Sequence, residues 1–315
     1  MSKVLVIGAF GQLGSELTLA LRNIHGTDNV IAADIRKPQG PLSDGPFEQL
    51  DVLNGKELGR IVNVHNIQQI YHLAAILSAK GESNPKFAWQ LNMDSLINVL
   101  ELAREKQLEK IYWPSSIAVF GPNTPKQNTP QNTVMDPNTI YGISKLAGER
   151  WCEYYFEKYG VDVRSLRYPG LIGYKAKPGG GTTDYAVDIF YKAIEKGNYE
   201  CFLRPNTYLP MMYMDDAIRA TIEIMEADHA SIKVRSSYNV GALSFSPEEI
   251  ALEIKKHLGD FSIHYAPDFR QEIADSWPDS IDDSQARTDW NWQPDYGLKK
   301  MTETILAGLG ELLNA

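Results

Sequence analysis

The N-terminal stretch constrains the fold more than any other part of the chain. Residues 3–7 form a short apolar run typical of a buried parallel strand, and Gly8, Gly11 and Gly14 follow it directly. A helix is predicted from there to about Ile24. Glycines between a strand and a helix let the turn close and let backbone N–H groups approach a pyrophosphate. Any tight strand-to-helix turn uses glycine, but this placement favours nucleotide binding.

The second predicted strand ends in an acidic residue. Residues 29–33 form this strand, and Asp34 follows, 20 residues past Gly14. An acid at that tip accepts the hydroxyls of an adenosine ribose and repels a 2′-phosphate, which favours NAD over NADP. Arg36 and Lys37 follow closely and would soften that preference. The alternative interpretation of Asp34 is a loop-capping acid.

Two more predicted strands end near the same edge of the sheet. An edge strand is predicted over residues 47–50, and the acid that follows it would face the adenine of a bound dinucleotide. A fourth strand is predicted over residues 68–73. Small side chains after the fourth strand would let a cofactor pass close to the backbone. The residues concerned are Asp51 and Val52 after the edge strand, and Leu73, Ala74 and Ala75 at the end of the fourth.

Two serines follow the fifth predicted strand. Residues 110–113 form this strand, so Ser115 and Ser116 stand beyond its carboxyl end, where open parallel sheets bind ligands. Serines after a strand are also common turn formers. A helix over 85–106 precedes the strand, and a loop rich in Pro, Asn and Thr over 122–138 follows it. Long loops of this kind in compact domains are often functional.

A helix over 141–159, ended by Gly160, carries the most reactive candidate pair. Tyr141 and Lys145 are four residues apart, so the phenol and the ammonium lie on one helix face. A fixed cation favours the phenolate, and lowering a tyrosine pKa by about three units takes roughly 4 kcal/mol. A tyrosine tuned in this way can take a proton from an alcohol. An ordinary amphipathic helix start is the alternative.

Strands and helices alternate up to a sixth strand over 161–167, which predicts an α/β fold with a Rossmann-type, doubly wound parallel sheet. The pattern then loosens into a small, irregular C-terminal lobe expected to bind the substrate. Helices are predicted over 185–196, 217–226 and from 246, and strands over 208–214 and 238–240. The predicted NAD-binding domain is 1–170 with a contribution from 208–240, and the predicted lobe is 171–207 with 241–315.

The composition argues against several classes of function. A net charge of −9 and a pI of about 5.2 disfavour nucleic acid and anionic membrane surfaces as partners. Two cysteines and six scattered histidines form no ligand-like cluster, so no metal is predicted. No run approaches the ~20 apolar residues that a membrane span needs. We expect a soluble, cytoplasmic protein that binds small molecules.

The glycine loop, Asp34, the two serines and the tyrosine–lysine pair together resemble the extended short-chain dehydrogenase/reductase family across essentially the whole chain. The resemblance implies that Tyr141 is the catalytic base and Lys145 its electrostatic support. It also implies that Ser116, 25 residues before Tyr141, orients the substrate hydroxyl with Ser115 beside it.

Two later segments, 179–191 and 208–217, are similar to the short-chain type of L-threonine 3-dehydrogenase within that family. This implies oxidation of L-threonine by NAD⁺ to 2-amino-3-oxobutyrate and NADH. It places Ser78, Thr182 and Asp184 near the substrate's ammonium and carboxylate, together with Ser115 and Tyr141. The cofactor-binding residues that the resemblance implies are Gly8, Gly11, Gln12, Leu13, Gly14, Asp34, Asp51, Val52, Leu73, Ala74, Ala75, Asn92, Tyr141, Lys145 and Tyr168.

The family also suggests a homodimer through the helices near 86–106 and 141–159. A sugar-nucleotide epimerase or dehydratase of the same superfamily is the nearest alternative, and it would need a basic, aromatic pocket for a nucleoside diphosphate. A catalytically silent NAD-binding regulator is the alternative from another class, and the presence of the serine, the tyrosine and the lysine argues against it. The sequence offers no evident arginine partner for the carboxylate of threonine.

Overall fold

Six parallel strands form the central sheet of the computed structural model, which describes residues 2–314. Their spatial order is β3-β2-β1-β4-β5-β7, so the order reverses between β1 and β4. The reversal creates the crevice in which open α/β sheets bind ligands, and it confirms the predicted Rossmann-type fold. The bounds are β1 Lys3–Ile7, β2 Val30–Asp34, β3 Phe47–Gln49, β4 Ile67–His72, β5 Lys110–Tyr112 and β7 Val163–Arg164.

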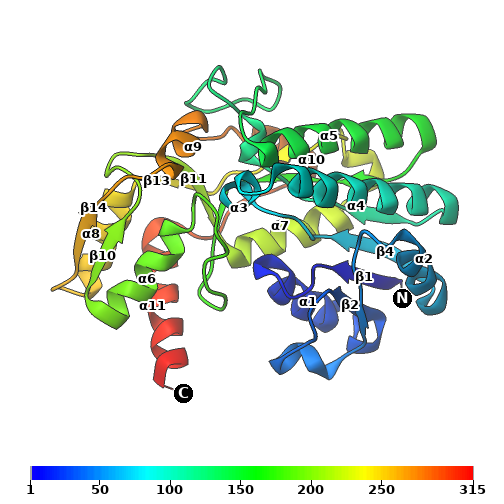
Figure 1. Cartoon of the computed structure of the whole chain (residues 1–315), viewed down its shortest axis with the longest axis horizontal. Coiled ribbons are helices and arrows are strands. Elements are labelled where there is room, and N and C mark those ends of the chain that lie inside the picture. Colours follow the sequence, from blue (N-terminus) through cyan, green and yellow to red (C-terminus); the bar gives the residue numbers. More distant parts are fainter. Residues whose placement is uncertain (1, 315) are drawn as a thin grey trace.

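Helices cover both faces of this sheet because the side chains of β1 alternate between two apolar cores. Val4 and Val6 pack with α1 and α7, whereas Leu5 and Ile7 pack with α2, α4 and α5. Burial on both faces explains the continuous apolar run that predicted the strand. Figure 1 shows α4 and α5 on one side of the sheet and α1 on the other. The bounds are α1 Gln12–His25, α2 Gly55–His65, α4 Pro85–Lys106, α5 Ile140–Tyr159 and α7 Met214–Glu226.

The predicted sixth strand over 161–167 is two strands in two sheets. It breaks at Ser165: β7 pairs with β5, whereas β8 (Leu166–Tyr168) lies between β6 (Ser115–Ser116) and β12 (Tyr238–Asn239). Pro114 separates β5 from β6, and a proline cannot donate the hydrogen bond that a continuous ladder needs. The second sheet therefore begins at the carboxyl end of the first, and Ser115 and Ser116 lie where the chain passes from one sheet to the other.

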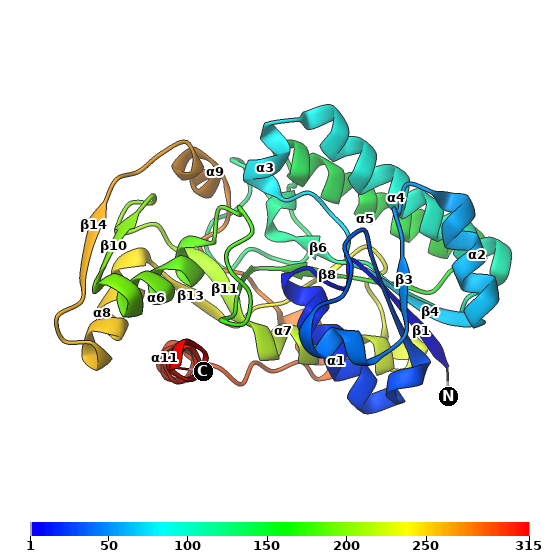
Figure 2. The same ribbon diagram turned by 60° about the horizontal axis from the view of Figure 1, so that its bottom comes forward.

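Most of the remaining strands and helices form a second lobe that is more regular than predicted. It has its own apolar core and contains the β13-β11-β9 sheet and the parallel β10-β14 pair. Figure 2 shows these elements apart from the α4 and α5 layer. The strands are β9 Gly170–Ile172, β10 Asn198–Cys201, β11 Leu209–Tyr213, β13 Leu243–Phe245 and β14 Ser262–Tyr265. The helices are α6 Tyr185–Lys196, α8 Pro247–His257, α9 Arg270–Ser276 and α11 Leu298–Asn314.

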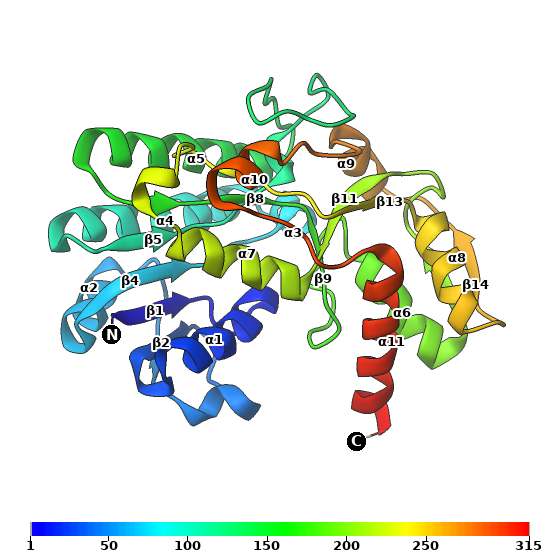
Figure 3. The same cartoon turned by 180° about the vertical axis from the view of Figure 1, so that it is seen from behind.

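The C-terminal third of the chain contributes to both lobes. Helix α10 (Ser284–Trp290) packs on β12, and Trp290 and Trp292 enter the same core as Val4 and Val6. Residues 284–292 therefore pack with the lobe that contains the central sheet, although the predicted division assigns them to the smaller lobe. Figure 3, which views the molecule from behind, shows α10 near α7 and β8. Helix α7 also begins three residues before the predicted start at 217.

Candidate active site

The glycine loop is closed so tightly that side chains would not fit. Gly8 has a φ of +79°, and a Cβ there would lie 2.8 Å from the backbone nitrogen of Ala74. A Cβ on Gly14 would lie 2.2 Å from the carbonyl oxygen of Gly8. Helix α1 starts at N-cap Gly11 with no side-chain cap and no acid in its first turn, so its N–H groups are left for an anion. This cradle suits a pyrophosphate.

Asp34 is buried at the tip of β2 and is held from two sides. One carboxylate oxygen, Oδ2, accepts the backbone N–H of Phe10 at 3.0 Å. The other, Oδ1, accepts the backbone N–H and the Nε of Arg36 at 3.0 and 3.1 Å. Arg36 remains 61% exposed, so the guanidinium pairs with the acid while still facing solvent. The acid is thus fixed at the carboxyl end of β2.

A cavity of about 250 Å³ lies between the glycine loop, the segment that contains Ser115 and Ser116, and the second lobe. Fifteen predicted site residues line it: Gly8, Gly11, Gln12, Leu13, Gly14, Leu73, Ala75, Ser78, Ser115, Ser116, Tyr141, Lys145, Tyr168, Thr182 and Asp184. Five predicted residues do not: Asp34, Asp51, Val52, Ala74 and Asn92. Of these, Asp51 is exposed and caps the N–H of Leu53, whereas Val52 is buried.

Tyr141 stands in the first turn of α5, where it hydrogen-bonds Ser116. The helix start is fixed by Thr139, whose hydroxyl accepts the N–H of Gly142 at 3.1 Å. A Cβ on Gly142 would lie 2.1 Å from the carbonyl oxygen of Ala118, so only glycine lets α5 approach the serine segment this closely. Burial raises the pKa of Tyr141 to about 12, and the Ser116 bond opposes that rise. The predicted lowering of this pKa is therefore wrong for the chain alone, because desolvation outweighs the hydrogen bond from Ser116.

Lys145 is buried behind the tyrosine. Its Nζ donates to the carbonyl oxygen of Pro114 at 2.5 Å and lies 4.4 Å from the ring centroid of Trp113. The same Nζ is 5.6 Å from the ring centroid of Tyr141. Burial lowers the pKa of Lys145 to about 7, against the opposing effects of Cys152 and Glu149. The ammonium is thus close to the phenol and loses its proton more easily than an exposed lysine.

The hydroxyl of Ser115 is engaged below the cavity. It donates to Oε1 of Glu149 at 2.6 Å, and Glu149 forms a buried ion pair with Arg167 through two bonds of 2.8 Å. Arg167 also donates to Asn239 at 3.0 Å. Although both serines line the cavity, Ser116 bonds the tyrosine whereas Ser115 bonds an ion pair of the framework.

Ser78 and Thr182 bring the two lobes together at the far end of the cavity. Their hydroxyl oxygens are 3.3 Å apart, and both side chains are buried. Oδ2 of Asp184 accepts the N–H groups of Gly180 and Gly181 at 2.7 and 2.8 Å. Burial raises the pKa of this carboxyl, and the glycine N–H groups oppose the rise. A cationic group bound nearby would also favour its charged form.

Two other predicted residues serve the framework through their polar atoms. The amide of Asn92 donates to the hydroxyl of Ser144 and the carbonyl oxygen of Ile76, and its oxygen accepts the Ile76 N–H. The hydroxyl of Tyr168 accepts a bond of 2.6 Å from Tyr112 and faces the core, although Tyr168 lines the cavity.

Nine cavity-lining residues were missed by the sequence analysis. Trp277 is notable because it comes from the second lobe and brings an indole N–H, a donor only. No local pattern distinguishes it from the other tryptophans of the tail. The nine are Leu77, Pro114, Ile117, Pro169, Gly170, Leu171, Gly181, Thr183 and Trp277.

Across residues 2–314, no group of three or more His, Cys, Asp and Glu side chains is arranged to hold a metal ion. None of the helices described there combines the length and apolar character needed to cross a membrane.

Comparison with known proteins places these features in a family. A model described as the NAD dependent epimerase/dehydratase family matches residues 4–241. An uncharacterized epimerase/dehydratase of Staphylococcus haemolyticus (strain JCSC1435) is 50% identical over 314 residues, covering 99% of this chain and 98% of that protein.

Several solved structures are similar to this protein over nearly the whole length of its chain. A partial consensus L-threonine 3-dehydrogenase is 58% identical with a TM-score of 0.96, covering 98% of this chain and 99% of that one. The holo form of a GalE-like L-threonine dehydrogenase from Cupriavidus necator is 56% identical, with the same TM-score and coverage. A monomeric L-threonine 3-dehydrogenase from a metagenome database, in its apo form, is 50% identical with a TM-score of 0.95 and coverage of 98% and 99%.

The family's cofactor fits the residues of this chain. The side-chain-free cradle at Gly8, Gly11 and Gly14 suits the pyrophosphate of NAD, and Asp34 suits its adenosine ribose. The chain belongs to the NAD-dependent epimerase/dehydratase family.

Proposed function

We propose that this protein is an L-threonine 3-dehydrogenase, which oxidises the 3-hydroxyl of L-threonine to give 2-amino-3-oxobutyrate. The observation that carries the proposal is a single cavity that joins Tyr141 and Ser116 to Ser78, Thr182 and Asp184. The first two residues suit an alcohol, and the other three suit the two charged groups of an amino acid. The similar L-threonine dehydrogenases of known structure support this assignment.

The reacting alcohol is handled by Tyr141 and Ser116. NAD⁺, when bound, accepts the hydride that leaves C3 of the substrate. The phenolate oxygen of Tyr141 takes the hydroxyl proton, and the Ser116 hydroxyl donates to the oxygen that becomes the carbonyl. Because burial keeps the phenol protonated in the free chain, Lys145 must retain its charge to favour the phenolate.

The two charges of the amino acid meet different groups. Asp184 uses Oδ2 for the glycine N–H groups, which leaves Oδ1 for the substrate ammonium. Among the cavity-lining residues in the described part of the chain, Lys145 alone carries a cationic side chain, and it serves the tyrosine. The substrate carboxylate is therefore assigned to neutral donors, namely the Ser78 and Thr182 hydroxyls and the indole N–H of Trp277.

The test is the formation of NADH at 340 nm with L-threonine and with L-serine, in parallel with an assay for the loss of a UDP-sugar. We expect reduction of NAD⁺ with L-threonine and little with L-serine, because the 3-methyl group adds apolar contact. We also expect Tyr141→Phe to lose activity while keeping its affinity for NAD⁺. Turnover of the UDP-sugar without threonine oxidation would replace this proposal by a sugar-nucleotide activity. Binding of NAD⁺ with no turnover of any substrate would favour a silent regulator.

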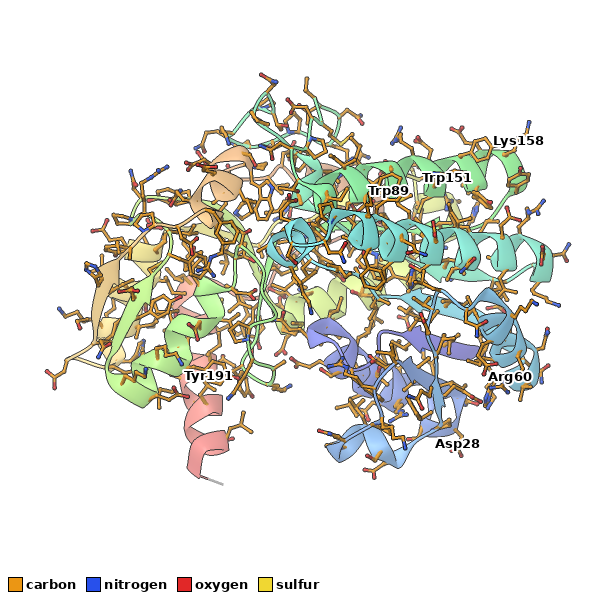
Figure 4. The ribbon with its side chains drawn as sticks, viewed as in Figure 1. Asp28, Arg60, Trp89, Trp151, Lys158 and Tyr191 are labelled. Carbon is orange, nitrogen blue, oxygen red and sulfur yellow. The ribbon has the colours of Figure 1, made fainter. Side chains whose placement is uncertain are left out.

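A homodimer is a second proposal, carried by exposed aromatic side chains on the packed pair α4 and α5. Trp89 is 40% exposed, Trp151 38% and Tyr154 46%. Figure 4 labels the two tryptophans on these helices. Contiguous exposed apolar surface marks interaction sites. We expect light scattering to give a dimer for the native chain and a monomer for Trp151→Arg, and a native monomer, as in the monomeric relative, would contradict this.

A cytoplasmic location is the remaining proposal. Cys152 and Cys201 are both free thiols and buried, which suits a reducing compartment. Cell fractionation followed by detection of the protein tests it, and recovery outside the cytoplasmic fraction would refute it.

A further inference from the structure

Helix α3 (Ser78–Glu82) occupies a position between the catalytic helix and the second lobe. Its first residue, Ser78, lines the cavity and contacts Thr182 of the second lobe. Leu77, just before it, also lines the cavity and approaches Gly179. This end of α3 therefore touches the segment proposed to hold the amino acid's charged groups.

The other end of α3 touches the start of α5. Oε1 of Glu82 accepts the backbone N–H of Ile140 at 2.8 Å, and Ile140 immediately precedes Tyr141. The first N–H groups of a helix have no partner within the helix, so this carboxylate satisfies one of them and lies at the positive end of the helix dipole. Gly81 adds close packing, since a Cβ there would lie 3.2 Å from Cγ2 of Ile140.

A third contact fixes the chain just before α3. Asn92 binds both the N–H and the carbonyl oxygen of Ile76 and donates to Ser144 on α5. Segment 76–82 is thus attached at one end to α4 through the buried amide of Asn92, and at the other end to α5 through the exposed carboxylate of Glu82. Figure 2 shows α3 beside the ends of α4 and α5.

We propose that Glu82 is a positioning residue that holds α3, and with it Ser78, against the helix that carries Tyr141. Through this bond, the groups that hold the amino acid and the base that takes its proton keep one fixed distance. Glu82 touches neither substrate nor cofactor, and it acts through the Ile140 N–H. The inference rests on the proposed function only for the identity of the amino acid.

Thr139 provides a matched control at the same helix terminus. Its hydroxyl caps the Gly142 N–H, as Glu82 caps that of Ile140, but Thr139 makes no bond to α3. Loss of either cap frays the first turn of α5, so both Thr139→Ala and Glu82→Ala should lower kcat. Only Glu82→Ala also removes the bond between α3 and α5, which leaves the Asn92 contacts at Ile76 to hold this segment against the helices, and it alone should raise KM for the amino acid.

The kinetic experiment measures kcat and KM for L-threonine at saturating NAD⁺ in the full chain. We expect at least a fivefold higher KM in Glu82→Ala, a KM within twofold of native in Thr139→Ala, and near-native values in Glu82→Gln. The glutamine amide oxygen can still accept the Ile140 N–H, so rescue identifies the bond and not the charge. A native KM in Glu82→Ala, or no rescue by Glu82→Gln, would overturn the proposal.

Hydrogen exchange of the free protein tests the same bond without any substrate. In Glu82→Ala we expect the amides of residues 78–82 and of Ile140 to exchange at least about tenfold faster, whereas Thr139→Ala should speed exchange in α5 alone. Unchanged exchange over 78–82 in Glu82→Ala would refute the tether. If the native chain fails to oxidise L-threonine, the proposed function falls, and the exchange result still decides the role of Glu82.

Discussion

Two adjacent serines should respond in opposite ways to the same substitution. Ser115 is 2% exposed and donates to the ionised Glu149, whereas Ser116 bonds Tyr141 at the cavity. A hydrogen bond to a charged group contributes about 1.5–3 kcal/mol, so Ser115→Ala should lower the free energy of unfolding by that amount. Glu149 keeps its two bonds to Arg167, so its charge stays compensated. We expect kcat in Ser115→Ala to fall less than about tenfold, which is about 1.4 kcal/mol.

Ser116→Ala should do the reverse. Loss of a donor to the reacting oxygen typically costs about 10²–10³ in kcat. The Ser116 hydroxyl also caps the N–H of Ala118 at 3.2 Å, so Ser116→Ala should lower the free energy of unfolding by about 1 kcal/mol. NADH formation at 340 nm gives kcat, and urea unfolding followed by tryptophan fluorescence gives stability. A hundredfold loss of kcat in Ser115→Ala at native stability would show that its hydroxyl reaches the substrate, and would refute this division of roles.

Three further outcomes are expected. His72 is fully buried and bonded to Ser95, and burial lowers its pKa from 6.5 to about 3, so the free energy of unfolding falls as the pH drops below 6.5 and the unfolded chain takes up the proton. The native chain should therefore lose about 2 kcal/mol between pH 8 and pH 5 that His72→Gln does not lose, and urea unfolding at both pH values measures this difference. An equal loss in both proteins would contradict the prediction. Asp34→Asn keeps an acceptor for the Phe10 N–H but removes the charge that repels a 2′-phosphate, so the ratio of kcat/KM for NADP⁺ to that for NAD⁺ should rise at least about tenfold. An unchanged ratio would show that Asp34 does not determine the preference for NAD⁺. Gly14→Ala places a Cβ 2.2 Å from the Gly8 carbonyl oxygen and should weaken NAD⁺ binding at least about tenfold in a fluorescence titration, whereas native affinity would mean that the loop yields.

Local signals in the sequence predicted the helices and the first sheet well. Helix α4 has the predicted bounds, because Pro85 at its first turn and the N-cap of Asn84 mark its start. Helix α6 also has the predicted bounds and ends at Gly197, which has a φ of +69°. The glycine loop was recognisable because a tight turn between a strand and a helix leaves no room for side chains, so the constraint is local in the sequence.

Features that depend on distant segments were not predictable. The strand over 161–167 looks continuous in sequence. Pro114, however, separates the strands with which its two halves pair, so the chain changes sheets at Ser165. The hydroxyl of Ser115 is directed by Glu149, a residue on another element. Trp277 reaches the cavity from the second lobe. The pKa of Tyr141 depends on burial, which no i,i+4 spacing reports.

During synthesis, the second sheet and the core on one face of the central sheet cannot be completed until later parts of the chain have been made. Strand β8 needs β12 as a neighbour, and the core around Val4 and Val6 is completed by Trp290 and Trp292. When Tyr168 has emerged, about 120 residues still separate it from these tryptophans, which takes roughly 6 to 25 s at about 5–20 residues per second. A nascent chain released at residue 170 would expose the apolar face that α7 and the two tryptophans cover. The core that supports the glycine loop is thus completed late in translation, although the loop itself is synthesised before the segments that complete this core.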